Sequence, residues 1–144
     1  MDGPIVVGTD GSETATAAVL EAIRMASAFN QPLHIVAAYR PDNLKVSGLP
    51  DEFANAVTPS VHVEAVIEDV ASRARQAGVK VEGRTVQGDP AEAIIKTAED
   101  VAAAVIVVGN KGIGSLKRFM LGNVPSKIVH HAPCSTYVVH TTEI

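Results

Sequence analysis

The sequence predicts one α/β domain with an open, doubly wound sheet of parallel strands and helices on both of its faces. Two observations favour this fold. Short apolar runs alternate with segments of helical periodicity, an order typical of parallel βαβ units. Two of the runs, residues 4–8 and 104–108, are almost continuous Val and Ile, as expected of strands buried on both faces of a sheet.

Five strands are expected from the short apolar runs. The third of them alternates polar and apolar residues from Val79 to Glu82, which is typical of a half-exposed edge strand. The five predicted strands are residues 4–8, 33–39, 79–86, 104–108 and 136–140.

Four helices are expected between the strands. Ser12 is the predicted N-cap of the first helix, and Gly78 the residue that follows the second. The pair Asp89-Pro90 predicts the start of the third helix with an N-cap and a proline at the first helical position. The four predicted helices are residues 12–29, 61–77, 90–101 and 123–131.

Length and composition indicate a single domain over residues 1–144. A net charge of −4 argues against general nucleic-acid binding. The N-terminus has no basic region before an apolar core, and no stretch approaches the length of a membrane helix. The one cysteine, Cys134, excludes an internal disulfide and fits a reducing compartment. We therefore expect a cytoplasmic protein with neither a nucleic acid nor a membrane as partner.

The segments that leave the first and fourth strands, residues 8–12 and 109–112, are small, polar and marked by glycine. In doubly wound sheets ligands bind beyond the carboxyl ends of the strands, where the strand order reverses. Glycine and helix N-termini let backbone N–H groups approach an anion, and Lys111, Lys117 and Arg118 add charge. The glycine pattern favours an anion or nucleotide site over a purely structural turn. The three cationic side chains fit a ligand contact and a solvated face equally well.

Asp10 is a carboxylate beside this predicted anion site. It suits three roles: acceptor for a ribose hydroxyl, partial ligand of Mg²⁺, or N-cap of the first helix. The dinucleotide fingerprint Gly-x-Gly-x-x-Gly and the P-loop pattern are both absent from the sequence. No His-x3-His or Cys-His spacing occurs, so no protein metal site is expected, and Cys134 is expected to be a small core residue.

Two motifs resemble the universal stress protein family. Residues 6–12, Val-Val-Gly-Thr-Asp-Gly-Ser, look like its opening, and Gly109-x2-Gly112-x9-Gly122-Asn123 is similar to its nucleotide motif, Gly-x2-Gly-x9-Gly-Ser/Thr. The likeness covers essentially the whole chain. It implies a Rossmann-like fold of the nucleotide-binding α-hydrolase type with strand order 3-2-1-4-5, a homodimer formed through strand 136–140, and ATP binding.

The resemblance also implies roles for individual residues. Thr9 and Asp10 would border the base and ribose, and the backbone at Ala38 would meet the adenine. The motif glycines would let the chain wrap the ribose and phosphates, with contacts to phosphate from the start of the last helix. The nucleotide-binding residues so implied are Gly8, Thr9, Asp10, Ala38, Gly109, Asn110, Lys111, Gly112, Arg118, Gly122, Asn123 and Val124.

One position departs from the family pattern. Asn123 stands where the family has Ser or Thr, and its amide can still donate a hydrogen bond and cap a helix. The change bears on triphosphate binding more than on adenine binding. The expected ligand is therefore ATP, with Mg²⁺ as an accompanying ion, or alternatively cyclic AMP.

The predicted function is an adenine-nucleotide-binding stress-response or signalling module whose ligand state alters the dimer or the binding of an unidentified protein partner. The main alternative is an enzyme, either a slow ATPase or a self-phosphorylating protein. No general base beyond Asp10 and no arginine finger can be singled out, so no catalytic residue is expected. A nucleotide-free scaffold is disfavoured by the intact glycine spacing.

Overall fold

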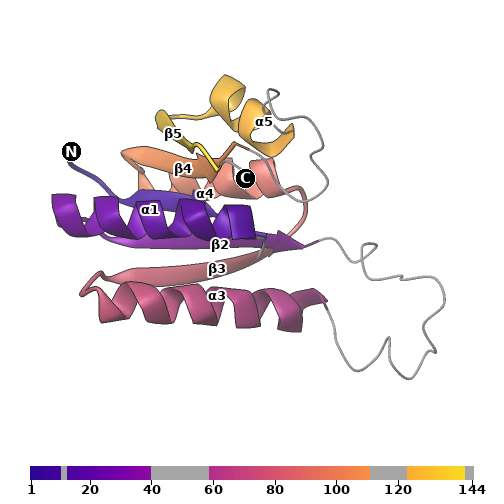
Figure 1. Cartoon of the computed structure of the whole chain (residues 1–144). Helices are drawn as coiled ribbons and strands as arrows, with labels where there is room; N and C mark the ends of the chain where they lie inside the picture. Colours follow the sequence, from indigo (N-terminus) through magenta and orange to yellow (C-terminus); the bar gives the residue numbers. More distant parts are fainter. Residues whose placement is uncertain (11–12, 40–58, 111–122, 142–144) are drawn as a thin grey trace.

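The computed structural model describes residues 1–10, 13–39, 59–110 and 123–141. Its centre is a five-stranded sheet in which every strand pair is parallel and the order is β3-β2-β1-β4-β5 (Figure 1). The predicted fold class and the strand order 3-2-1-4-5 are therefore confirmed.

The strands and helices alternate along the chain as the sequence predicts. The strands are β1 (Ile5–Gly8), β2 (Leu33–Tyr39), β3 (Val81–Gln87), β4 (Val105–Gly109) and β5 (Ser135–Val139). The helices are α1 (Glu13–Phe29), α3 (Pro59–Gln76), α4 (Pro90–Val101) and α5 (Asn123–His131). The predicted cap Ser12 lies outside the described residues.

Four of the five predicted strands differ from the observed ones by one or two residues at an end. The strands predicted at 4–8 and 104–108 are Ile5–Gly8 and Val105–Gly109. The strand predicted at 79–86 begins at Val81, because the N–H of Val79 donates to the carbonyl of Ala74 at 3.0 Å and closes the turn after α3. Gly78 in that turn has φ +78°, the left-handed conformation expected of a residue that follows a helix. The last strand is Ser135–Val139 rather than 136–140, since its pairing with β4 begins at Ser135.

The central strands are buried, as their continuous apolar sequences predict. Val6 and Val7 of β1 are fully buried, and so are Ile106 and Val107 of β4. The edge strand β3 is half-exposed, which agrees with its alternating sequence. The central strands of this sheet are thus buried on both faces, whereas the edge strand β3 is not.

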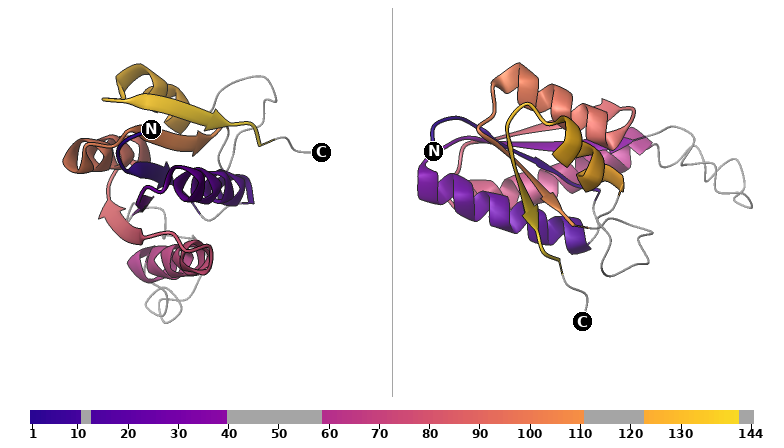
Figure 2. Two further views of the ribbon diagram at one scale, coloured as in Figure 1. Left: turned by 90° about the vertical axis from the view of Figure 1, so that its left-hand side faces the viewer. Right: turned by 90° about the horizontal axis from the view of Figure 1, so that it is seen from above.

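The helices cover the two faces of the sheet and enclose two cores (Figure 2). α1 and α3 pack on one face against the side chains that point there from β1, such as Ile5. α4 and α5 pack on the other face, where Val6 and Ile106 of the sheet share a core with Ile94 and Ile128 of the helices. Each strand of the centre therefore sends alternate side chains into opposite cores.

α4 begins where the sequence predicts. The side chain of Asp89 accepts a hydrogen bond from the N–H of Glu92 at 3.0 Å, and Pro90 occupies the first turn. This N-cap satisfies one of the backbone donors that the first turn of a helix leaves without an intrahelical partner.

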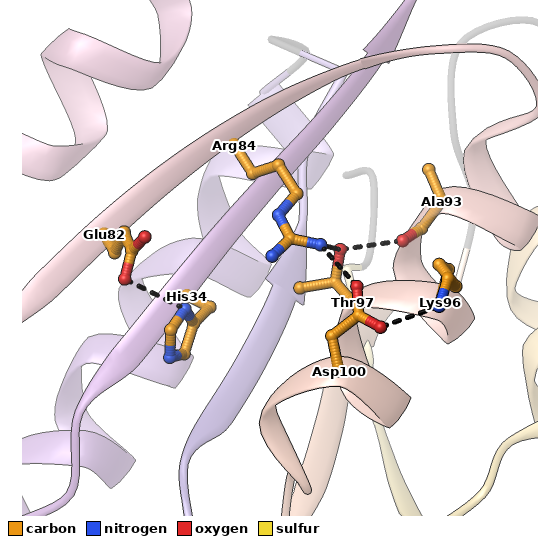
Figure 3. Close-up of polar contacts among 7 residues, drawn as sticks. All are labelled: His34, Glu82, Arg84, Ala93, Lys96, Thr97 and Asp100. Atoms are coloured by element: carbon orange, nitrogen blue, oxygen red, sulfur yellow. Dashed lines mark hydrogen bonds and ion pairs between the residues drawn. The ribbon is translucent and has the colours of Figure 1, made fainter.

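A polar cluster joins β3 to α4 (Figure 3). The buried hydroxyl of Thr97 donates to the carbonyl of Ala93 at 2.9 Å and accepts from Nη1 of Arg84 at 3.2 Å. Arg84 also reaches Asp100 at 3.1 Å, and Lys96 contacts the second oxygen of the same carboxylate at 2.8 Å. The charged edge strand is thus held to the helix by hydrogen bonds on its α4 side.

His34 of β2 lies beside this cluster, with Nδ1 3.8 Å from Oε2 of Glu82. Burial lowers the pKa of His34, Arg84 adds to the lowering, and Glu82 opposes it. Below the ordinary pKa of histidine, the unfolded chain therefore binds more protons at this residue than the folded chain does. The free energy of unfolding should decrease as the pH falls through this range. Urea unfolding measures this change. Between pH 7.5 and pH 5, the free energy of unfolding should decrease less for His34→Gln than for the natural chain.

His140→Gln is the control for this pH dependence, because His140 is exposed and lies one residue beyond β5. It should leave the stability difference between the two pH values unchanged. A His34→Gln variant with the same pH dependence as the natural chain would contradict the assignment.

Candidate functional site

The carboxyl ends of β1 and β4 lie side by side at the centre of the sheet. The two strands pair in register from Ile5↔Val105 to Val7↔Val107, while β2 follows β1 on its other side. The strand order therefore reverses between β1 and β4, at the predicted switch point. The helices α1, α4 and α5 follow β1, β3 and β4, so their N-termini face this same edge and bring partial positive charge to it (Figure 1).

Gly8 is the last residue of β1, and its lack of a side chain has a packing reason. A Cβ at this position would lie 3.0 Å from Cγ1 of Ile94 and closer still to its Cδ1 atom. Glycine thus lets α4 sit against the central strand. Sequence reasoning assigned Gly8 only to close approach of a ligand and missed this contact, which joins residues far apart along the chain.

Thr9 and Asp10 continue from the end of β1. The N–H of Thr9 donates to the carbonyl of Val36 at 2.9 Å, which extends the pairing with β2, and Thr9 is buried. Asp10 is exposed. The chain therefore leaves β1 at the carboxyl end of the sheet, where the Asp10 carboxylate is exposed to solvent.

Gly109 and Asn110 leave the neighbouring strand β4. Gly109 pairs with Val139 of β5, and the N–H of Asn110 donates to the carbonyl of Val139 at 3.0 Å. Oδ1 of Asn110 accepts hydrogen bonds from the N–H of Thr141 at 2.8 Å and from its hydroxyl at 2.5 Å. Thr141 is a residue that sequence reasoning missed, since nothing in its local sequence marks it as buried.

The start of α5 lies beside the start of α4. Pro125 and Ile128 anchor α5 in the core. Nζ of Lys127 lies 3.3 Å from Oδ2 of Asp89 and 3.5 Å from Oε1 of Glu92. Burial of α5 and these ion pairs together fix the position of its first turn.

The predicted residues at the start of α5 and at the end of β2 take different environments. Asn123 is exposed, while Val124 is half-buried against the core. Ala38, near the end of β2, pairs with Val86 and is half-buried. The structure thus brings six predicted residues to the ends of the adjacent strands β1, β4 and β2: Gly8, Thr9, Asp10, Ala38, Gly109 and Asn110.

Four further predicted site residues, Lys111, Gly112, Arg118 and Gly122, lie outside the described residues, as does Lys117. Within the described ranges, no cluster of three or more His, Cys, Asp or Glu side chains is arranged to hold a metal ion. Of the helices that the structure describes, none is long and apolar enough to cross a membrane.

Cys134 is half-buried beside the core between α4, α5 and the sheet. Burial raises the pKa of its thiol, while a backbone hydrogen bond with Ile106 acts in the opposite direction. Since the thiolate is the nucleophilic form, this environment fits the predicted packing role rather than a reactive one.

The sequence matches the model of the universal stress protein family over residues 1–140. It is 33% identical over 141 residues to universal stress protein Rv1636 of Mycobacterium tuberculosis H37Rv, covering 96% of each chain. It is 29% identical over 147 residues to universal stress protein YxiE of Bacillus subtilis, covering 96% of this chain and 99% of that one.

Solved structures show the same fold. A universal stress protein crystallised in complex with cAMP is 32% identical and superposes with a TM-score of 0.75 over 97% of this chain and 98% of its own. The protein MJ0577 is 26% identical and has a TM-score of 0.77, over 99% of this chain and 98% of its own.

Proposed function

The chain belongs to the universal stress protein family, and we propose that it binds an adenine nucleotide at the carboxyl ends of β1 and β4. One observation carries the proposal. Asp10 and Gly109 lie at the carboxyl ends of two paired strands, on the side of the sheet that the helix N-termini face. A relative of 32% identity with the same fold is known in complex with cAMP, which supports an adenine nucleotide as ligand.

The proposed arrangement takes the residue roles that the family resemblance implies and sets them on the observed order of the strands. The adenine lies toward the end of β2, near Ala38, and the ribose hydroxyls donate to the exposed carboxylate of Asp10. The phosphates lie toward residues 109–124, where the first turn of α5 offers backbone N–H groups. ATP and cyclic AMP share the adenine and ribose, so both are candidates, and ATP would bring Mg²⁺ as a counter-ion.

We propose a binding module rather than an enzyme, one whose ligand state alters its assembly or its affinity for a protein partner. Among the described residues at this edge, the carboxylates of Asp89 and Glu92 are paired with Lys127. Asp10, exposed just beyond the carboxyl end of β1, is the carboxylate proposed to meet the ligand, in a hydrogen-bonding role. Steady turnover of ATP by the purified protein would favour the alternative, a slow ATPase.

Denaturing mass spectrometry of the purified protein tests the proposed function. We expect an adenine nucleotide to be released on denaturation, or to be retained after incubation with ATP or cyclic AMP and removal of free ligand. Protein that releases no nucleotide and retains neither compound would contradict the proposal.

We further propose a homodimer formed through β5. This strand lies at an edge of the sheet, where backbone groups are available for pairing with a second chain, and its Tyr137 is 43% exposed. Light scattering at micromolar concentration should give the mass of a dimer, and Tyr137→Lys should shift it toward a monomer because charge on an edge strand opposes pairing.

Val129→Lys is the matched control for assembly, because Val129 is similarly exposed, at 48%, but lies on α5. It should leave the mass unchanged. A monomeric natural chain, or equal effects of the two lysines, would contradict an interface at β5.

A further inference from the structure

We propose that Asn110 is a positioning residue for the nucleotide: its side-chain oxygen holds Thr141, and this contact fixes the backbone where the chain leaves β4 toward residues 111–122. The inference rests on the proposed function and deepens it. It gives Asn110, which the resemblance places among the nucleotide-binding residues, an indirect role through its side-chain oxygen, and it adds Thr141 to the residues on which binding depends.

The hydrogen bonds determine which way the Asn110 side chain faces. A backbone N–H can only donate, so the group 2.8 Å from the N–H of Thr141 must be the carbonyl oxygen of the Asn110 amide and not its NH₂. The same oxygen accepts from the hydroxyl of Thr141. The carbonyl oxygen of Asn110 is thus occupied within the protein, and its two acceptor sites are both used.

The backbone of Asn110 is held on the same side. Its N–H donates to the carbonyl of Val139 at 3.0 Å, one residue beyond the last pair of the β4–β5 ladder. Asn110 therefore forms hydrogen bonds with the residue before His140, Val139, and with the residue after it, Thr141. This three-bond clamp ties the first residue after β4 to the segment that follows β5.

Burial makes the clamp costly to break. Thr141 is 5% exposed, and a buried hydroxyl or N–H that loses its acceptor remains unsatisfied. Within the described residues no buried side-chain nitrogen or oxygen lacks a partner. The contact with Asn110 is therefore a strong local constraint, even though its two ends are 31 residues apart in sequence.

The position of the clamp connects it to binding. Gly109 and Asn110 are the last described residues before residues 111–122, which carry most of the glycine motif. A backbone that is fixed before the ligand arrives does not lose conformational freedom when the ligand binds, so the clamp should raise affinity without a contact of Thr141 with the ligand.

Calorimetric titration of the full chain with ATP and with cyclic AMP tests the inference. Thr141→Val removes the hydroxyl donor, and it should weaken binding about fivefold, the equivalent of one neutral hydrogen bond. Thr141→Ser keeps the donor and should bind as the natural chain does. All variants are compared at a temperature at which unfolding curves show them fully folded, so a loss of global stability alone would not change the measured affinity.

A double-mutant cycle identifies the partner of Thr141. Asn110→Ala should weaken binding at least as much as Thr141→Val, and the double variant should bind no more weakly than Asn110→Ala alone. Weaker binding by Asn110→Ala with no effect of Thr141→Val would show that binding does not depend on the Thr141 hydroxyl, and would overturn the inference. Unchanged affinity in all variants would overturn it while leaving the proposed function intact. If the natural chain binds neither nucleotide, the proposed function fails and the inference fails with it.

Discussion

Replacement of Gly8 by alanine is expected to lower the free energy of unfolding by about 1–3 kcal/mol, the usual effect of an added methyl group in a packed core. The added Cβ would overlap the end of the Ile94 side chain, which packs from α4 onto the last residue of β1. Equilibrium unfolding in urea measures the loss. Because Gly8 also stands at the proposed site, stability rather than affinity is the readout that reports this contact.

A shortened partner side chain should relieve the overlap. Ile94→Ala alone should cost about 2–5 kcal/mol, since it leaves a cavity in the core. In the double variant Gly8→Ala/Ile94→Ala the new methyl group occupies part of that cavity, so the combined loss should be smaller than the sum of the two single losses. Ile128→Ala is the matched control. Ile128 is buried in the same core, but none of its atoms is among the three nearest to a Cβ at residue 8.

The control pair Gly8→Ala/Ile128→Ala should give additive losses. Additive losses for Gly8→Ala/Ile94→Ala as well, or a Gly8→Ala variant as stable as the natural chain, would show that the glycine is not there to admit Ile94.

Asp10→Ala is expected to weaken nucleotide binding by about tenfold or more. A hydrogen bond to a charged group contributes about 1.5–3 kcal/mol, and each 1.4 kcal/mol changes an affinity tenfold. The exposed carboxylate at the end of β1 is the group that we propose to accept from the ribose hydroxyls. Calorimetric titration with ATP and cyclic AMP measures the change, and Asp2→Ala is the control, because Asp2 is exposed at the opposite, amino end of β1.

Asp10→Asn separates the three roles that the sequence leaves open for this residue. As a ribose acceptor, the amide oxygen should restore part of the affinity without Mg²⁺. If Asp10 is a metal ligand, Asp10→Asn should weaken chiefly the binding of ATP in the presence of Mg²⁺. As a helix cap, Asn should equal Asp, and Asp10→Ala should lower stability instead of affinity. Equal binding by all the variants would remove Asp10 from the site.

The elements of this fold were predictable because their signals are local. The Val and Ile runs of β1 and β4 indicate burial on both faces, and Asp89-Pro90 places the start of α4 within one residue. The start of β3 was missed because the N–H of Val79 donates to the carbonyl of Ala74 in the last turn of α3, and a local sequence pattern does not reveal that hydrogen bond. The strand order came from the resemblance to a family, since periodicity says nothing about which strands are neighbours.

The site was predictable only in part, for the same physical reason. Asp10 and Gly109 follow apolar runs, so their place at the carboxyl ends of strands follows from the sequence. The packing of Ile94 on Gly8 and the bonds between Asn110 and Thr141 join residues far apart along the chain. Such contacts depend on how a helix or an edge strand docks on the sheet, which the order of residues does not reveal.

The central claim is that an adenine nucleotide binds at the carboxyl ends of β1 and β4. Titration of the full chain, after removal of any co-purified nucleotide, with ATP and with cyclic AMP tests it most directly. We expect saturable binding of at least one of them, with one nucleotide per chain, and weaker binding of the same ligand to Asp10→Ala than to Asp2→Ala. Absence of binding of both nucleotides at millimolar concentration to the folded natural chain would contradict it.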